Sequence, residues 1–172
     1  MTSHVLLVPY DPGWPRRFDE ERHVLAAVFI GAEAVIEHVG STAVPGLGSK
    51  PVIDVMVGVP RLAVVEDRIP ALEAAGYEYV QEYETQLPER KYFRKPRFGT
   101  RMFHVHCVVT GSGFWIQHLA FRDYLRAHPD VAAAYDRFKE DLATRVSKAD
   151  YTEAKSPFIE HVLASAMDGR QR

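Results

Sequence analysis

The sequence predicts an α+β, or mixed α/β, fold: a mixed β-sheet flanked by helices, followed by a C-terminal helical cluster. Short apolar runs alternate with helical patterns up to about residue 110, and the run at 51–59 is apolar almost throughout. Three helical patterns then follow with no further strand between them. Because no shift in composition marks a linker, we expect residues 1–172 to form a single domain.

Composition limits the classes of protein that this chain can be. Apolar residues make up 47% of its 172 residues, enough for a core without disulfides. Its 21 basic and 23 acidic residues give a net charge of −2, which does not favour nucleic acid as a partner. The single Cys107 cannot form an internal disulfide and suits a reducing compartment. No window approaches ~18 uninterrupted apolar residues, and no signal peptide begins the chain, so we expect a cytoplasmic protein without a membrane span.

The first half of the chain should supply most of the sheet. Residues 4–10 suit a short strand or extended arm, and a helix should begin near Trp14 and end near Gly31. Strands are expected at 33–39 and 51–59, the second buried on both faces, with a loop from Gly40 to Lys50 between them. A helix over 61–75 contains Pro70, which predicts a kink or an early break. Tyr77–Tyr83 then has the composition of a strand.

The second half should begin with a hairpin and end in helices. Basic residues 88–101 and apolar residues 102–109 predict two strands that turn near 96–99. Helices are expected over 114–127 and 130–146, and Asp150 can cap a last one. Pro157 lies inside that last pattern, and either a kink or a separate helix beginning at Ser156 is consistent with it.

The loop after the first strand has the residues of a phosphate-binding turn. Gly40, Ser41 and Thr42 offer backbone N–H groups and hydroxyls, and Lys50 adds a cation. Glycine and proline also punctuate ordinary loops, so a plain connection between strands is an equally simple interpretation.

Three side chains are candidate metal ligands or catalytic groups. Asp54 lies in an apolar strand, where a carboxylate is costly to bury unless it is paired or bound to metal. His104 and His106 alternate along a later strand and should share one face. Each histidine can equally be a hydrogen-bonded core or surface residue, and the same two alternatives hold for His38.

Several basic side chains are further candidates for binding anions. Arg94 and Arg101 belong to the basic hairpin, which suits either a polyphosphate clamp or a charged sheet edge. Its aromatic residues would also stack on the base of a nucleotide or on single-stranded nucleic acid. Arg122 and Lys155 interrupt apolar helical stripes, so they either reach the surface or point into a cavity.

The segment HVGSTAVPGLGSKPVIDVMVGV, residues 38–59, resembles the signature of the GrpB-like family, predicted members of the nucleotidyltransferase superfamily. VPYDPGWPRRFDEE, FHVHCVV, HLAFRDYLRAHPDVAAAYDRFKEDLA and YTEAKSPFI resemble other blocks of that family, so the likeness covers roughly residues 5–165. Relatives also occur fused to dephospho-coenzyme A kinase. The resemblance implies a nucleotidyltransferase-like sheet, with Gly40 and Ser41 holding nucleotide phosphates and Asp54 holding Mg²⁺ or Mn²⁺.

The sequence departs from the superfamily pattern in its carboxylates. The superfamily places a second acid two residues after the first and a third on a later strand, whereas this chain has Met56 and then His104 and His106. Glu37, Glu82 and Glu84 are the candidate replacements.

Two main hypotheses follow. The first is a metal-dependent enzyme that transfers a nucleotidyl or phosphoryl group from a nucleoside triphosphate to an unknown acceptor. The second is a module that binds a nucleotide or another anionic metabolite without turnover. A metal hydrolase built on Asp54, His104 and His106 is a weaker third hypothesis.

Overall fold

A five-stranded mixed sheet forms the centre of the computed structural model, which describes residues 5–97 and 100–168, apart from the side chains of residues 97, 100 and 101. The strand order is β1-β2-β5-β4-β3. β2 and β5 run parallel, and the other neighbouring pairs are antiparallel. The strands are β1 (Val35–Val39), β2 (Ile53–Val59), β3 (Glu78–Tyr79), β4 (Arg90–Arg97) and β5 (Thr100–Val109). The predicted mixed sheet is therefore confirmed.

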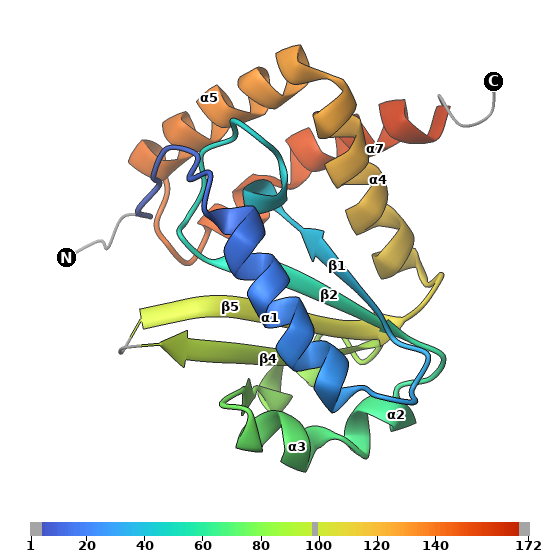
Figure 1. Ribbon diagram of the computed structural model, residues 1–172. Coiled ribbons are helices and arrows are strands. Elements are labelled where there is room, and N and C mark those ends of the chain that lie inside the picture. The colour runs from blue at the N-terminus through green and yellow to red at the C-terminus, as the bar shows by residue number, and fades with distance from the viewer. Residues whose placement is uncertain (1–4, 98–99, 169–172) are drawn as a thin grey trace.

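Helices precede, interrupt and follow this sheet. Figure 1 shows α1 lying across the sheet and α4, α5 and α7 clustered together at the top of the view. Among the described residues, none of the helices has the length and apolar character needed to cross a membrane. The helices are α1 (Trp14–Val28), α2 (Ala63–Glu66), α3 (Ile69–Ala74), α4 (Gly113–Ala127), α5 (Pro129–Arg145), α6 (Tyr151–Ala154) and α7 (Ser156–Asp168), with 3₁₀ turns η1 (Ser41–Ala43) and η2 (Gln81–Thr85).

The two faces of β2 pack against different helices, because alternate side chains along a strand point to opposite faces. Val55 and Val57 are fully buried in the main core, which also contains Leu25 of α1 and residues of α2 and α3. Met56 lies on the opposite face, in a smaller apolar cluster with Trp115 of α4. The prediction that this strand is buried on both faces is confirmed.

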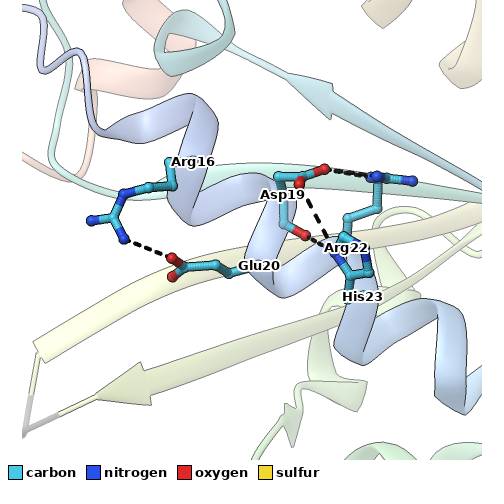
Figure 2. A network of polar contacts seen from close by, with 5 residues as sticks. All are labelled: Arg16, Asp19, Glu20, Arg22 and His23. Atoms are coloured by element: carbon cyan, nitrogen blue, oxygen red, sulfur yellow. Dashed lines mark hydrogen bonds and ion pairs between the residues drawn. The ribbon is translucent and has the colours of Figure 1, made fainter.

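A hydrogen-bonded turn precedes α1, and the exposed side of this helix carries charged residues. The Asp11 carboxylate accepts a hydrogen bond of 2.7 Å from the Gly13 backbone N–H immediately before the helix. Figure 2 shows the exposed network along the helix, in which Arg16 pairs with Glu20 and the Asp19 carboxylate accepts from the Arg22 guanidinium. Exposed pairs of this kind contribute little to stability.

Proline decides two boundaries that the sequence left open. The predicted helix over 61–75 is broken into α2 and α3, with Pro70 in the first turn of α3. Pro157 likewise occupies the first turn of α7, so the last pattern is two separate helices. In both cases a proline is tolerated where its missing N–H needs no intrahelical partner.

Three predicted extended segments either differ from the prediction or lie partly outside the residues that the structure describes. The predicted strand at Tyr77–Tyr83 is wrong beyond Glu78–Tyr79, because the chain turns into η2 and packs the Tyr83 ring 5.4 Å from that of Tyr92. At the N-terminus, where residue 4 is not described, the extended arm makes one antiparallel bridge, between Val8 and Ser49. The tip of the predicted hairpin, at residues 98–99, lies outside the described residues.

Candidate functional site

A cavity of about 560 Å³ lies between the sheet face that carries Asp54 and residues of α4, α5, α6 and α7. This volume is in the range of small-molecule sites, about 300–1,000 Å³. The cavity brings together much of the predicted set, from segments far apart in the sequence. The predicted residues that line it are Gly40, Ser41, Lys50, Asp54, His104, His106 and Lys155.

The loop after β1 approaches Asp54 through a glycine backbone. Gly40 has φ of 73° and ψ of −171°, a conformation that is essentially restricted to glycine. A Cβ atom at this position would lie 2.7 Å from Asp54 Oδ2. Only glycine therefore allows the loop to turn into η1 while its backbone touches the carboxylate, which places Ser41 at the cavity wall.

Asp54 is held between two histidines of the neighbouring strand. Parallel pairing aligns Asp54 with His104 and Met56 with His106, so both histidines share the face of Asp54. Asp54 Oδ1 lies 3.3 Å from His104 Nδ1 and 3.6 Å from His106 Nε2. Burial alone would raise the pKa of Asp54, but hydrogen bonds from the two histidines outweigh it and hold the pKa far below its usual range. Asp54 is therefore a carboxylate anion.

Three lysines from distant segments reach the same cavity. Lys139 of α5 lies 3.4 Å from the Ser41 hydroxyl, and also donates to the Gly48 carbonyl. Lys50 and Lys155 each lie 5.1 Å from the centre of the Tyr151 ring. Burial lowers the pKa of all three lysines, and for Lys155 the pKa falls to about 8, with repulsion from Lys50 as the next cause.

Aromatic side chains and an arginine form another part of the cavity wall. Arg90 lies over the Tyr92 ring at 4.9 Å, and its Nη1 is 3.2 Å from Nδ1 of His106. The His118 ring stacks on Phe114 with centroids 3.8 Å apart. Burial lowers the pKa of His118 to about 4, so its ring is neutral at pH 7. This wall is suited to a flat, uncharged chemical group.

Two polar residues predicted near the loop lie outside the cavity lining. The Thr42 hydroxyl lies 2.9 Å from His38 Nε2, and both residues are buried. The His38 ring also stacks on Phe18 of α1 at 4.6 Å. Burial lowers the pKa of His38 to about 4, so of its two interpretations the structure supports the core histidine.

Two of the remaining predicted arginines, Arg94 and Arg122, do not line the cavity. Arg94 pairs with Glu78 across β3 and β4 at 2.6 Å. Arg122 is buried and donates to Glu37 at 2.6 Å and to the His38 carbonyl at 3.0 Å, which ties α4 to β1. The side chain of Arg101 lies outside the described residues.

A family model described as "GrpB protein" matches residues 4–165. The chain belongs to the GrpB family. It is 33% identical to the glutamate-rich protein GrpB of Alkalihalophilus pseudofirmus, over 94% of the chain and 95% of that protein. The crystal structure of GrpB from Enterococcus faecalis superimposes with a TM-score of 0.86 at 34% identity, covering 97% of the chain and 100% of the crystallised one.

Two proteins with lower sequence identity also match this chain. The GrpB-family chain is 28% identical to a dephospho-CoA kinase of Mycolicibacterium paratuberculosis, over 95% of the chain but 46% of that protein. The Cid1 poly(U) polymerase structure with MgGTP bound matches with a TM-score of 0.53 at 14% identity, covering 80% of the chain and 44% of the polymerase. That likeness shows a nucleotidyltransferase-like fold.

The carboxylates of the GrpB-family cavity do not form the set that two metal ions need. Met56, where a second acid would stand, is fully buried among apolar side chains. The candidate replacements Glu37, Glu82 and Glu84 do not line the cavity: Glu37 pairs with Arg122, Glu84 pairs with Lys91 at 2.8 Å, and Glu82 is exposed.

The donor set therefore does not fit a two-metal Mg²⁺ centre. Such a centre requires oxygen ligands for two cations about 4 Å apart, and the cavity offers the single carboxylate of Asp54 and three imidazoles, of which those of His104 and His106 lie beside it. Over the ranges 5–97 and 100–168, no group of three or more His, Cys, Asp or Glu residues is arranged to hold a metal ion.

Sequence reasoning missed several residues of the cavity. Lys139 carried a usable signal in the sequence, because it lies four positions after Tyr135 and three before Leu142, on the side of the helix that carries apolar residues; the structure buries it to 2% exposure. Tyr151 and His118 carried no signal in the sequence, since an aromatic residue on a helix usually packs in the core. Arg90 was one of many basic residues in its segment, and only the position on β4 distinguishes it.

Proposed function

We propose that this GrpB-family protein binds the phosphate groups of a nucleotide, or of another anionic metabolite, in the cavity between the sheet and the C-terminal helices. The charge of the lining carries the proposal. Its lining contains four cationic side chains, Arg90, Lys50, Lys139 and Lys155, but a single carboxylate, Asp54; among the described residues, only Lys139 has a further acidic partner, Asp136, outside the lining. Half-buried positive charge in this excess is costly unless an anion compensates it.

The placement of these charges supports a ligand with several charged phosphate oxygens rather than one with a single charge. Lys139 lies 3.4 Å from the Ser41 hydroxyl, and Lys50 and Lys155 lie near the Tyr151 ring. Several cations at fixed positions suit a ligand with several charged oxygens, and a serine hydroxyl supplies an additional hydrogen bond to one of them. The wall of Arg90, Tyr92 and Phe114 would accept the base of a nucleotide.

The melting temperature of the protein with and without nucleoside triphosphates tests this proposal. A ligand at 100 times its Kd stabilises a folded protein by about 2.7 kcal/mol. For a domain of this size, that corresponds to a rise of roughly 5–10 °C. The Ser41→Ala variant should show a smaller rise. If neither nucleoside triphosphates nor inorganic polyphosphate changes the melting temperature, the proposal is wrong.

Nucleotidyl transfer is the second candidate, supported by the likeness of fold to a nucleotide polymerase and by the contact between the Gly40 backbone and Asp54. This candidate requires Asp54, His104 and His106 to rearrange around a single Mg²⁺ or Mn²⁺ ion, because in the described structure they do not form a metal site. Pyrophosphate release from a nucleoside triphosphate in the presence of either metal is the measurement. Release that persists in Asp54→Asn would contradict these roles, and release of inorganic phosphate instead would favour a metal hydrolase.

A further inference from the structure

Tyr151 carries a buried hydroxyl that no residue of the described part of the chain satisfies. The residue is 1% exposed and lines the cavity, and its oxygen has no hydrogen-bond partner there. A buried hydroxyl without a partner costs about 1–3 kcal/mol, and such a group in a native protein calls for a reason. A ligand oxygen in the cavity would supply the missing partner.

The ammonium groups of Lys50 and Lys155 both lie near the ring of Tyr151. Each is 5.1 Å from the centre of the Tyr151 ring. Neither forms an ion pair with any described residue, whereas Lys139 lies 3.4 Å from the Asp136 carboxylate. A residue with an unsatisfied hydroxyl and two unpaired cations thus lie together in the lining of the cavity.

Asp54, by contrast, has little capacity left for a metal. Its Oδ1 faces His104 and His106, and its Oδ2 lies against the Gly40 backbone. The next residue on the same face of β2 is Met56, which is packed into an apolar cluster. Positive charge therefore reaches the ligand from lysines, while the oxygen donors that Mg²⁺ prefers are scarce.

We propose that Lys50, Lys139 and Lys155 neutralise the phosphates of the ligand and that the Tyr151 hydroxyl donates to one of them, so that binding requires no metal ion. This inference rests on the proposed function and specifies its chemistry. Mg²⁺ competes with the lysines for the same oxygens, and the free metal complex of the ligand carries less negative charge. Added Mg²⁺ should therefore leave binding unchanged or weaken it.

Calorimetric titration of the full chain with sodium tripolyphosphate, and separately with ATP, tests the inference. The same Kd, within about threefold, or a weaker one in Mg²⁺ is expected when excess EDTA is compared with excess Mg²⁺. Binding that appears only with Mg²⁺ or Mn²⁺ would overturn the inference and leave the proposed function standing. Absence of binding under both conditions would overturn both.

Two variants test the residues. Lys155→Met should weaken tripolyphosphate binding by about tenfold or more in EDTA, as expected for loss of a charge-assisted contact. Lys148→Met is the matched control, because Lys148 is exposed and near enough to influence Lys50 but does not line the cavity. Equal losses in the two variants would show a general field effect and overturn the assignment.

Tyr151→Phe separates binding from packing. Removing an unsatisfied buried hydroxyl should leave the melting temperature of the free protein unchanged or higher. Affinity for tripolyphosphate should nevertheless fall about fivefold, because one donor to the ligand is lost. Unchanged affinity, or a loss of affinity accompanied by a lower melting temperature, would contradict the role given to this hydroxyl.

Discussion

Replacing Gly40 by alanine should destabilise the protein through two separate effects at the site. The backbone there adopts φ of 73° and ψ of −171°, and holding a residue other than glycine in this region costs about 1–3 kcal/mol. The new Cβ would also lie 2.7 Å from Asp54 Oδ2. Relieving such an overlap in a packed site costs typically another ~1–3 kcal/mol.

Together the two effects should lower the free energy of unfolding by about 2–6 kcal/mol. The middle of this range corresponds to a fall of roughly 12 °C in melting temperature for a domain of this length. Urea unfolding followed by circular dichroism measures the loss directly. Gly46→Ala is the matched control, because Gly46 has φ of 81° but open space around the added carbon. It should show the conformational cost without the overlap.

A double-mutant cycle isolates the overlap itself. Removing the Asp54 side chain as well, in Gly40→Ala combined with Asp54→Ala, should recover about 1–3 kcal/mol relative to the sum of the single changes. If Gly40→Ala costs no more than Gly46→Ala and shows no coupling to Asp54, the close contact between loop and carboxylate does not constrain this site.

Four further outcomes are expected. The affinity of the cavity for tripolyphosphate should fall by up to about tenfold per pH unit as the pH rises through 8, because Lys155 loses its proton near that pH; calorimetry across pH 6–10 measures it, and a flat profile would contradict the role of this lysine. The free protein should instead gain stability from this group between about pH 8 and 10.4, since the unfolded chain keeps a proton that the native state has lost; a melting series over that range, compared with Lys155→Met, isolates the contribution. Met56→Asp should cost at least about 3 kcal/mol, because it buries a carboxylate in an apolar cluster, and Mg²⁺ should not restore the loss. Arg122→Met should cost about 2 kcal/mol in urea unfolding, a value reduced because Glu37 is partly exposed, and a loss below 0.5 kcal/mol would show that the pair does not tie α4 to β1.

Much of the sheet and one side of the site could be predicted from local sequence patterns. Alternation along residues 102–109 placed His104 and His106 on one face, because the period of a strand is two. The near-continuous apolar run around Asp54 identified a strand buried on both faces. Gly40 and Ser41 were recognisable because a glycine and a hydroxyl follow the end of a strand.

Local patterns failed where a segment's conformation depends on distant partners. Tyr77–Tyr83 has the composition of a strand, but β4 offers it a partner for only two residues, so the rest forms a 3₁₀ turn. Arg94 and Arg122 were candidates for binding anions because they are arginines, but in the structure they form ion pairs with Glu78 and Glu37. No local rule pairs residues that are 16 and 85 positions apart.

Tertiary structure alone decided the charge of the cavity. Lys50 follows the loop, Lys139 belongs to α5 and Lys155 lies between α6 and α7, so nothing in their spacing indicates that they converge. Burial then lowers the pKa of all three lysines, and repulsion from Lys50 lowers that of Lys155 further, a property of three-dimensional position that composition does not contain. The strand, the glycine turn and the lone carboxylate could be predicted from the sequence, whereas only the packing of the C-terminal helices brought Lys139 and Lys155 into the same cavity as that carboxylate.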